Sequence, residues 1–237
     1  MANKEPVVQW AKGLHSVIYN SQIVSLDETK DRFIFFEPDQ GKFIESIIHK
    51  SPNHLTSKDR EFISELTECG ILSIEERNPG KPFADVKNSL GAFTCEWRNG
   101  DDSWRLGDLT PTLFIKAFIY LKRAKTLTEA GKLSKLLNDL RASSAHQKKT
   151  SQRRLVKIGN NINFAIKLLS VEVKCLEFAY SLSRIAFEES LRCSFNIGVQ
   201  THPFISHAWT EGPYGVILDK AELPQDLAII VSIGATG

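Results

Sequence analysis

The stretch KCLEFAYSLSRI, residues 174–185, decides how the C-terminal half of the chain folds. Its apolar residues recur at steps of three and four, which predicts an amphipathic helix, and the residues before it lack that pattern. Cys175 is therefore predicted to lie at the helix N-terminus, where unpaired backbone N–H groups and the positive end of the helix dipole point. Both favour the thiolate form of a cysteine, which is the nucleophile.

Strands are predicted after this helix. Residues 193–199 alternate between apolar and polar side chains, Pro203 interrupts the alternation, and residues 205–211 resume it, which is the periodicity of strands. The sequence Gly-Pro-Tyr-Gly at 212–215 predicts a turn. A third strand is predicted over residues 216–219.

This order of elements places three complementary groups in one α+β core. Cys175 is predicted at the helix start, His207 on the second strand and Asp219 at the end of the third. A thiol nucleophile needs a base within hydrogen-bond reach, and the base needs an acceptor that orients it. We therefore predict a Cys–His–Asp hydrolase site, with Glu211 and Asp226 as rival acceptors.

Other candidate nucleophiles and bases are interpreted as structural. A lone cysteine or histidine is more often part of the packing than of a site. This interpretation applies to Cys69, Cys95, Cys193 and His202.

Three blocks in this region resemble the B proteins of lasso-peptide biosynthesis, in particular the microcin-type members. The blocks are CLxxAYxLxRI from residue 175, IGVxTxPFxSHAW from residue 197 and VIxD from residue 216. The resemblance implies a cysteine protease of transglutaminase-like, papain-like fold that removes the leader from a ribosomal precursor. It further implies that Cys175, His207 and Asp219 are the catalytic residues.

The resemblance also implies the partners. In that family the freed N-terminus is closed into a ring by an ATP-using partner synthetase, so ATP is implied for the coupled maturation reaction. The chain has no GxxxxGK[ST] motif for a P-loop of its own. Four cysteines without regular spacing argue against a disulfide framework or a structural zinc, so no metal is expected. Two other functions stay open: a Cys–His–Asp acyltransferase, and a non-catalytic module that binds the precursor.

The first 78 residues are predicted to form a winged-helix-like module. Three strands are predicted over residues 14–19, 22–26 and 32–36, followed by a helix through residues 43–48 and a second helix from Thr56. This order resembles the peptide-recognition elements that bind precursor leaders. In those elements the leader adds as a strand beside the third strand and packs on the last helix, which an unpaired strand edge allows.

The positions that match this leader site are Arg32, Phe33, Ile34, Phe35, Phe36, Phe62 and Leu66. The alternative is that their apolar side chains simply form the core. DNA binding is a further alternative for a winged helix, and the mixed charges of residues 57–61 argue against it.

The predicted domains are a recognition element at 1–78, a linker with a hairpin at 79–108 and a protease domain at 109–237. Helices are predicted from Thr110, from Thr126 with Glu129 as its cap, and over residues 156–169. Residues 116–167 carry 13 Lys and Arg against Glu129 and Asp139. This basic region is interpreted either as solvated helix faces or as a surface for an acidic substrate segment, the partner synthetase or a nucleotide.

Composition sets the remaining bounds. The chain has 237 residues, 42% of them hydrophobic, and a net charge of +2, which suits one large or two small folded domains. The N-terminus lacks the apolar segment of a signal peptide, and no apolar run approaches the length of a membrane span. A cytoplasmic protein is the expectation.

Overall fold

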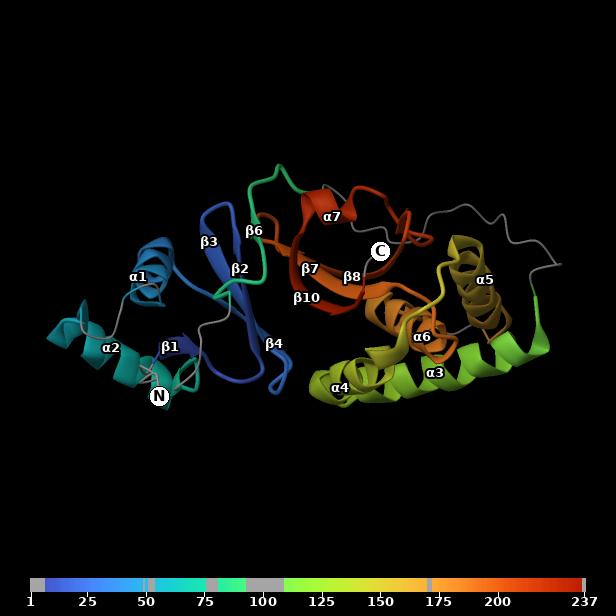
Figure 1. The fold of residues 1–237 in the computed structure, drawn as a ribbon, viewed down its shortest axis with the longest axis horizontal. Helices are drawn as coiled ribbons and strands as arrows, with labels where there is room; N and C mark the ends of the chain where they lie inside the picture. Colours follow the sequence, from blue (N-terminus) through green and yellow to red (C-terminus); the bar gives the residue numbers. More distant parts are fainter. Residues whose placement is uncertain are drawn as a thin grey trace.

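The computed structural model describes residues 7–48, 50, 54–75, 81–92, 109–169 and 172–235. An N-terminal module of strands and two helices lies on the left of Figure 1, and a larger α+β domain lies on the right. The predicted hairpin between residues 93 and 106, residues 78–80 of the domain boundary predicted at 78–82, and Cys95 lie outside the described residues. The division into three domains therefore stays a prediction.

The N-terminal module is built on a four-stranded sheet with the order β4-β3-β2-β6. Its strands are β2 (Leu14–Tyr19), β3 (Gln22–Asp27), β4 (Arg32–Phe35) and β6 (Val86–Lys87). The three strands predicted first are confirmed as an antiparallel meander. The fourth, β6, lies in the stretch expected to be a linker and pairs in parallel with β2. The outer edge of β4 has no partner among the described strands.

Two helices and a small ribbon complete the module. They are α1 (Pro38–Ile48), α2 (Ser57–Glu68), and the antiparallel pair β1 (Val7–Trp10) and β5 (Leu72–Glu75). The predicted start of α2 is confirmed, because the Asp59 backbone N–H donates to Thr56 Oγ1 (3.2 Å) and the Thr56 backbone N–H donates to Asp59 Oδ2 (2.9 Å). This capping box satisfies backbone donors at the helix start.

The two faces of the N-terminal sheet are buried against different layers. Successive side chains of a strand point to opposite faces of the sheet. The apolar side chains of this sheet therefore belong to two different hydrophobic cores. One face joins the core of the larger domain through Val17, Tyr19, Val24 and Leu26. The other face packs on α1 through Ile18, Ile23, Ile34 and Phe36. The module is therefore attached to the larger domain through a shared core.

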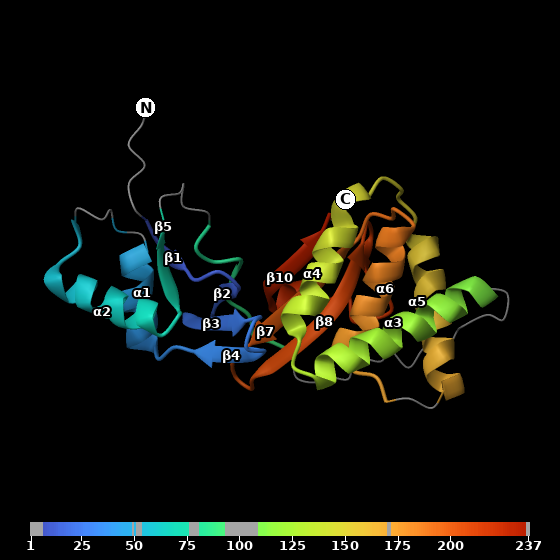
Figure 2. The same ribbon diagram turned by 90° about the horizontal axis from the view of Figure 1, so that it is seen from below.

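The larger domain is organised around one buried helix. Its helices are α3 (Pro111–Glu129), α4 (Leu133–Ser143), the 3₁₀ turn η3 (Ser144–His146), α5 (Gln152–Leu169), α6 (Cys175–Glu188) and the short α7 (Leu223–Asp226). Helix α6 lies between the sheet and helices α3 and α5 (Figures 1 and 2). No helix among the described residues is long and apolar enough to cross a bilayer.

The sheet beside α6 is antiparallel with the order β10-β7-β8-β9. Its strands are β7 (Ser194–Gln200), β8 (Ile205–Gly212), β9 (Gly215–Val216) and β10 (Ala228–Gly234). The strands predicted over residues 193–199 and 205–211 are confirmed as β7 and β8 to within one residue at either end. The predictions did not include β10, which pairs with β7 at one edge of this sheet.

The helix predicted to begin at Thr126 is wrong. Helix α3 runs without a break to Glu129, and the Thr126 hydroxyl donates to the Lys122 carbonyl (3.0 Å) inside it. The break comes at Gly131, whose φ of 60° suits a glycine at a helix end. Helix α4 then begins at Leu133, and its buried face follows the predicted pattern.

Acidic side chains neutralise part of the basic region. Lys116 pairs with Glu188 (3.0 Å), Arg123 with Asp139 (3.1 Å), Arg154 with Glu189 (2.6 Å) and Arg141 with Glu28 (2.7 Å). Three of these acidic partners lie outside residues 116–167, where the sequence pattern alone cannot associate them with the basic side chains. The region therefore helps to hold the fold together, and its predicted binding roles stay predictions.

One ion pair connects the N-terminal module to α4. The Arg141 guanidinium donates to both carboxylate oxygens of Glu28, at 3.1 and 2.7 Å. Glu28 is buried and also contacts His15 Nε2 at 2.8 Å. Burial raises the pKa of Glu28, but the hydrogen bonds and charges of His15 and Arg141 outweigh it and lower the pKa to about 2.

Removing the arginine should destabilise the protein. Arg141→Ala leaves the buried Glu28 carboxylate without its guanidinium, and we expect a loss of about 1–3 kcal/mol of unfolding free energy. The contribution is complete above the ordinary pKa of 4.5 and is lost as the pH falls through about 2, so the difference should shrink in acid. Urea unfolding of the wild type and the variant at several pH values measures this difference in unfolding free energy. Arg153→Ala, at an exposed position of α5, is the control, and equal stabilities for both variants would contradict this account.

Candidate active site

Cys175 is the first residue of α6, as the sequence predicts. The buried Glu177 carboxylate closes the first turn, accepting the Lys174 backbone N–H (2.9 Å) and the Thr128 hydroxyl (2.8 Å). A carboxylate three residues after a helix cap is a known capping signal, and Glu177 was missed in the sequence. Through Thr128, Glu177 connects α3 to the N-terminal end of α6, which is the end that carries the thiol.

Hydrogen bonds fix α6 against β8, the strand that carries His207. Ser183 Oγ and Thr210 Oγ1 lie 2.8 Å apart, and the Thr210 hydroxyl donates to the Ala179 carbonyl at 3.2 Å. All three residues are buried. Buried polar groups that are fully paired favour one arrangement of the elements they connect. The position of the thiol relative to the imidazole is thus set by a helix and a strand rather than by loops.

The structure brings together the three predicted site residues. His207 Nε2 lies 2.7 Å from Asp219 Oδ2, and their side chains are only 4% and 8% exposed. Cys175 lies beside His207 in the lining of one cavity, close enough for each group to shift the pKa of the other. Because Nε2 contacts Asp219, the imidazole nitrogen left for the sulfur is Nδ1. We refer to these residues as the Cys–His–Asp cluster.

Asp219 reaches His207 by a different backbone path from the predicted one. The predicted third strand over residues 216–219 is wrong in its length, because β9 covers only Gly215–Val216. The chain then bends at Leu218, which has a φ of 54°, an uncommon conformation for a residue other than glycine. The Lys220 backbone N–H donates to Asp219 Oδ1 at 2.8 Å and helps to hold the carboxylate in place.

The two rival acceptors for the imidazole, Glu211 and Asp226, lie near other groups. Glu211 Oε2 lies 3.5 Å from Asn196 Nδ2. Asp226 ends α7 and lies near enough to Tyr19 to influence its pKa. Asp219 is the acceptor that contacts the imidazole.

An indole supports the imidazole from one side. The Trp209 ring stacks on His207, with a centroid separation of 6.4 Å and an interplanar angle of 14°. Gly198 lies opposite His207 on β7, and a Cβ there would come within 2.7 Å of the Trp209 ring. Only a glycine leaves room for this packing.

The electrostatics favour an ion pair between thiolate and imidazolium. Burial raises the pKa of the Cys175 thiol, but the hydrogen bond and charge of His207 and the backbone N–H groups of Ala208 and Leu176 together lower it below its ordinary value. Burial likewise lowers the pKa of His207, but the hydrogen bonds and charges of Asp219 and Cys175 raise it to about 9. A thiol that ionises beside a protonated imidazole is an activated nucleophile.

A small cavity of about 180 Å³ opens onto the thiol. Its lining includes Cys175, His207 and Ser206 from the larger domain. The N-terminal module contributes Phe33 from β4 and Asp31 from the turn before it. The predictions assigned Phe33 to leader binding and did not single out Asp31. The cavity is therefore formed jointly by both parts of the chain.

The predicted leader-binding residues separate into three environments. Ile34 and Phe36 belong to the core around α1, as the core interpretation allowed. Arg32 is exposed, Phe33 lines the cavity, and Phe35 is 45% exposed. Phe62 and Leu66 pack against the α1 core, where the Phe62 ring contacts Phe43. Both views place α2 away from β4 (Figures 1 and 2), and the leader-binding role of these residues stays a prediction.

Cys69, Cys193 and His202 lie apart from the cluster. Cys69 is exposed at the end of α2. Cys193 is buried before β7, where burial raises the pKa of its thiol to about 12. His202 is exposed in the turn before Pro203. In the part of the chain that the structure describes, no group of His, Cys, Asp and Glu could hold a metal ion; the expectation that none is needed stays a prediction.

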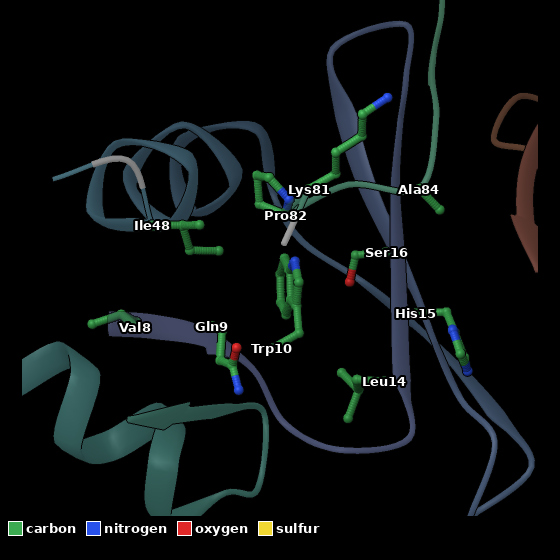
Figure 3. A pocket seen from close by; sticks show the side chains of 10 residues that line it. All are labelled: Val8, Gln9, Trp10, Leu14, His15, Ser16, Ile48, Lys81, Pro82 and Ala84. Atoms are coloured by element: carbon green, nitrogen blue, oxygen red, sulfur yellow. The ribbon is translucent and has the colours of Figure 1, made fainter. Parts of the chain in front are cut away.

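A second cavity, of about 230 Å³, lies in the N-terminal module. The indole of Trp10 stands in the middle of it, and His15 points away from it (Figure 3). The His15 imidazole pairs with Glu28. None of the side chains that line this cavity is a cysteine, whereas Cys175 lines the other cavity.

Comparison with known proteins relates the larger domain to one superfamily. Residues 118–232, just under half of the chain, match the family model of the transglutaminase-like superfamily, so this part of the chain is similar to transglutaminase-like domains. All members of the Cys–His–Asp cluster lie within it. No solved structure matches the chain.

The chain is also similar to the microcin J25-processing protein McjB of Escherichia coli. The two are 32% identical over 74 residues, which cover 31% of this chain and 36% of McjB. The chain thus spans about a third of the length of this curated relative. The family-model match and this similarity confirm the predicted resemblance to the B proteins of lasso-peptide biosynthesis.

The reactivity of the thiol should depend on the imidazole. We expect iodoacetamide to alkylate Cys175 at a lower pH in the wild type than in His207→Ala, because the variant keeps the burial and loses the hydrogen bond and charge that favour the thiolate. Site-resolved mass spectrometry across about pH 5 to 10 measures this. Asp219→Asn should shift the profile in the same direction, and the buried Cys193 should stay unmodified. Identical profiles for the wild type and His207→Ala would contradict the ion pair.

Proposed function

We propose that the protein is a cysteine peptidase that removes the leader from a ribosomal lasso-peptide precursor. The observation that carries this proposal is the Cys–His–Asp cluster at the edge of a cavity, with the thiol at a helix start and its base oriented by a carboxylate. The similarity to McjB, described as a processing protein for microcin J25, supports the choice of substrate. The transglutaminase-like domain supports the choice of chemistry.

The N-terminal module docks the leader. The free outer edge of β4 can accept an extended peptide as an added strand, with backbone hydrogen bonds supplying affinity. Phe33 lies on this strand and also lines the cavity at Cys175. A leader held on β4 therefore delivers the peptide bond that follows it to the thiol at high effective concentration. We retain this module as the winged-helix-like recognition element that the sequence predicts, with β4 rather than α2 as its docking element.

The reaction proceeds through a thioester. The Cys175 thiolate attacks the scissile carbonyl carbon, and backbone N–H groups at the start of α6 stabilise the negative oxygen. The tetrahedral intermediate collapses, the C–N bond breaks, and imidazolium His207 gives its proton to the leaving amine. Water then attacks the thioester while His207 takes one of its protons, releasing the leader carboxylate and the thiolate. Asp219 holds the imidazole in orientation throughout.

The product is a core peptide with a free N-terminus, which the ATP-using partner synthetase condenses onto an acidic side chain. ATP belongs to that ring-closing step, because the peptidase reaction consumes only water. A transglutaminase-type acyltransferase would use the same cluster and pass the acyl group to an amine. Hydrolysed and amide-linked products differ in mass, so mass spectrometry of the released leader separates the two reactions.

Replacing the nucleophile separates cleavage from binding. In Cys175→Ala we expect cleavage to fall by at least about 10⁴-fold, because the thioester cannot form, while the affinity for the leader stays within about twofold. Mass spectrometry of precursor incubated with the protein, with and without partner and ATP, gives the first value, and fluorescence anisotropy of a labelled leader gives the second. Cys69→Ala, at the exposed end of α2, is the matched control. Wild-type cleavage by Cys175→Ala would remove the peptidase proposal.

A charge on the docking strand should have the opposite effect. Phe35→Asp places a carboxylate on the exposed aromatic surface of β4, and we expect leader affinity to fall by about tenfold or more while the iodoacetamide reactivity of Cys175 is unchanged. Ile74→Asp, at a 56% exposed position of β5, is the control for an added surface charge. Unchanged leader affinity in Phe35→Asp would refute docking on β4.

A further inference from the structure

Three phenylalanines meet where the N-terminal module touches the larger domain. Phe204, in the turn between β7 and β8, contacts Phe33 with ring centroids 5.1 Å apart and Phe35 with centroids 4.9 Å apart. Both contacts are edge-to-face, at 65° and 90°, the geometry that aromatic pairs favour. We refer to these residues as the Phe204 cluster. Phe33 and Phe35 are predicted leader contacts, whereas no role is predicted for Phe204.

The Phe204 cluster runs from the surface into the cavity at the thiol. Phe35 is 45% exposed and Phe204 is 43% exposed, so two large apolar rings stand side by side in solvent. Phe33 is half-buried and lines the cavity with Cys175 and His207. Exposed aromatic surface that continues into a cavity marks a binding site more often than it marks a packing defect.

The turn that carries Phe204 is anchored. The buried Gln200 side chain donates from Nε2 to the Pro203 carbonyl (3.2 Å) and to the Ala92 carbonyl (3.0 Å). Phe204 precedes β8 and lies three residues before His207. In Figure 2 this turn passes beside β4. The ring is therefore held in a fixed position relative to both the docking strand and the imidazole.

We propose that the Phe204 cluster is a substrate subsite that holds an aliphatic or aromatic side chain of the leader close to the cut. This inference rests on the proposed function and names a specificity element within it. A leader that leaves β4 for Cys175 must cross this surface. An extended peptide advances about 3.3 Å per residue. The distance of about 5 Å between neighbouring rings of the cluster is therefore spanned by only one or two residues of a bound leader. Because Phe33 of the cluster lines the same cavity as Cys175, the preferred side chain lies only a few residues, about two to four, upstream of the scissile bond.

The test uses short peptides that report on the subsite without a full precursor. The probes are acetyl-tetrapeptidyl chloromethyl ketones with glycine next to the reactive group and alanine elsewhere, in which leucine or serine is placed in turn at the second, third and fourth positions. The thiolate displaces chloride and forms a stable S–C bond, so intact mass gives the alkylation rate. For the wild type we expect leucine to react about tenfold faster than serine at one of these positions.

The variants connect this preference to the cluster. In Phe204→Ala the ratio should fall to about one, and Phe204→Leu should retain most of it, because an apolar side chain of similar reach remains. Tyr214→Ala, at an 80% exposed aromatic position in the turn after β8, should keep the wild-type ratio. Iodoacetamide, which is too small to use the subsite, should react equally with all four proteins and shows that the thiol is intact.

The possible failures are distinguishable. Equal rates for leucine and serine in the wild type, or an undiminished preference in Phe204→Ala, would overturn the subsite and leave the peptidase proposal standing. A Cys175 that is inert to both the peptides and iodoacetamide would overturn the peptidase proposal, and the subsite with it.

Discussion

The burial of α6 against β8 is the constraint on which the site depends. Ser183 and Thr210 join the helix to the strand inside the core, and Glu177 closes the helix end that carries the thiol. Because both elements are rigid, the sulfur and the imidazole meet without being ordered by substrate. The hydrogen bond from His207 to Asp219 then orients the ring and, with the thiol, raises the pKa of the imidazole to about 9. Burial alone would have suppressed both charges.

The N-terminal module packs on the larger domain and also lines the cavity at the thiol. One face of its sheet is buried in the core of the larger domain, Arg141 connects it to α4, and Phe33 and Asp31 line the cavity at the thiol. A separate docking domain would only raise the local concentration of substrate. Here the proposed docking strand also forms a wall of the cavity, so binding and positioning of the peptide are properties of the same residues.

The sequence predicts local structure well where the periodicity is strong. The start of α6 at Cys175, the strands β2, β3, β7 and β8 and the capping box at Thr56 follow from residue patterns. One error was local: α3 continues through Thr126, where a helix was predicted to begin, and the chain breaks at Gly131. Other features depend on contacts between distant segments: Leu218 turns the chain so that Asp219 reaches His207, and Phe204 meets β4 across the domain junction. The placement of α2 away from β4 likewise reflects packing on α1, which the family pattern alone did not predict.

The most direct test of the central claim is to detect the thioester. Precursor and protein are mixed, quenched in acid at short times and examined by mass spectrometry of the Cys175 peptide. The account predicts a leader-sized acyl adduct on Cys175 that rises and decays as leader is released, and that is absent in His207→Ala. Leader release with no adduct on Cys175 at any time, at a rate unchanged in a variant that lacks this thiol, would contradict it.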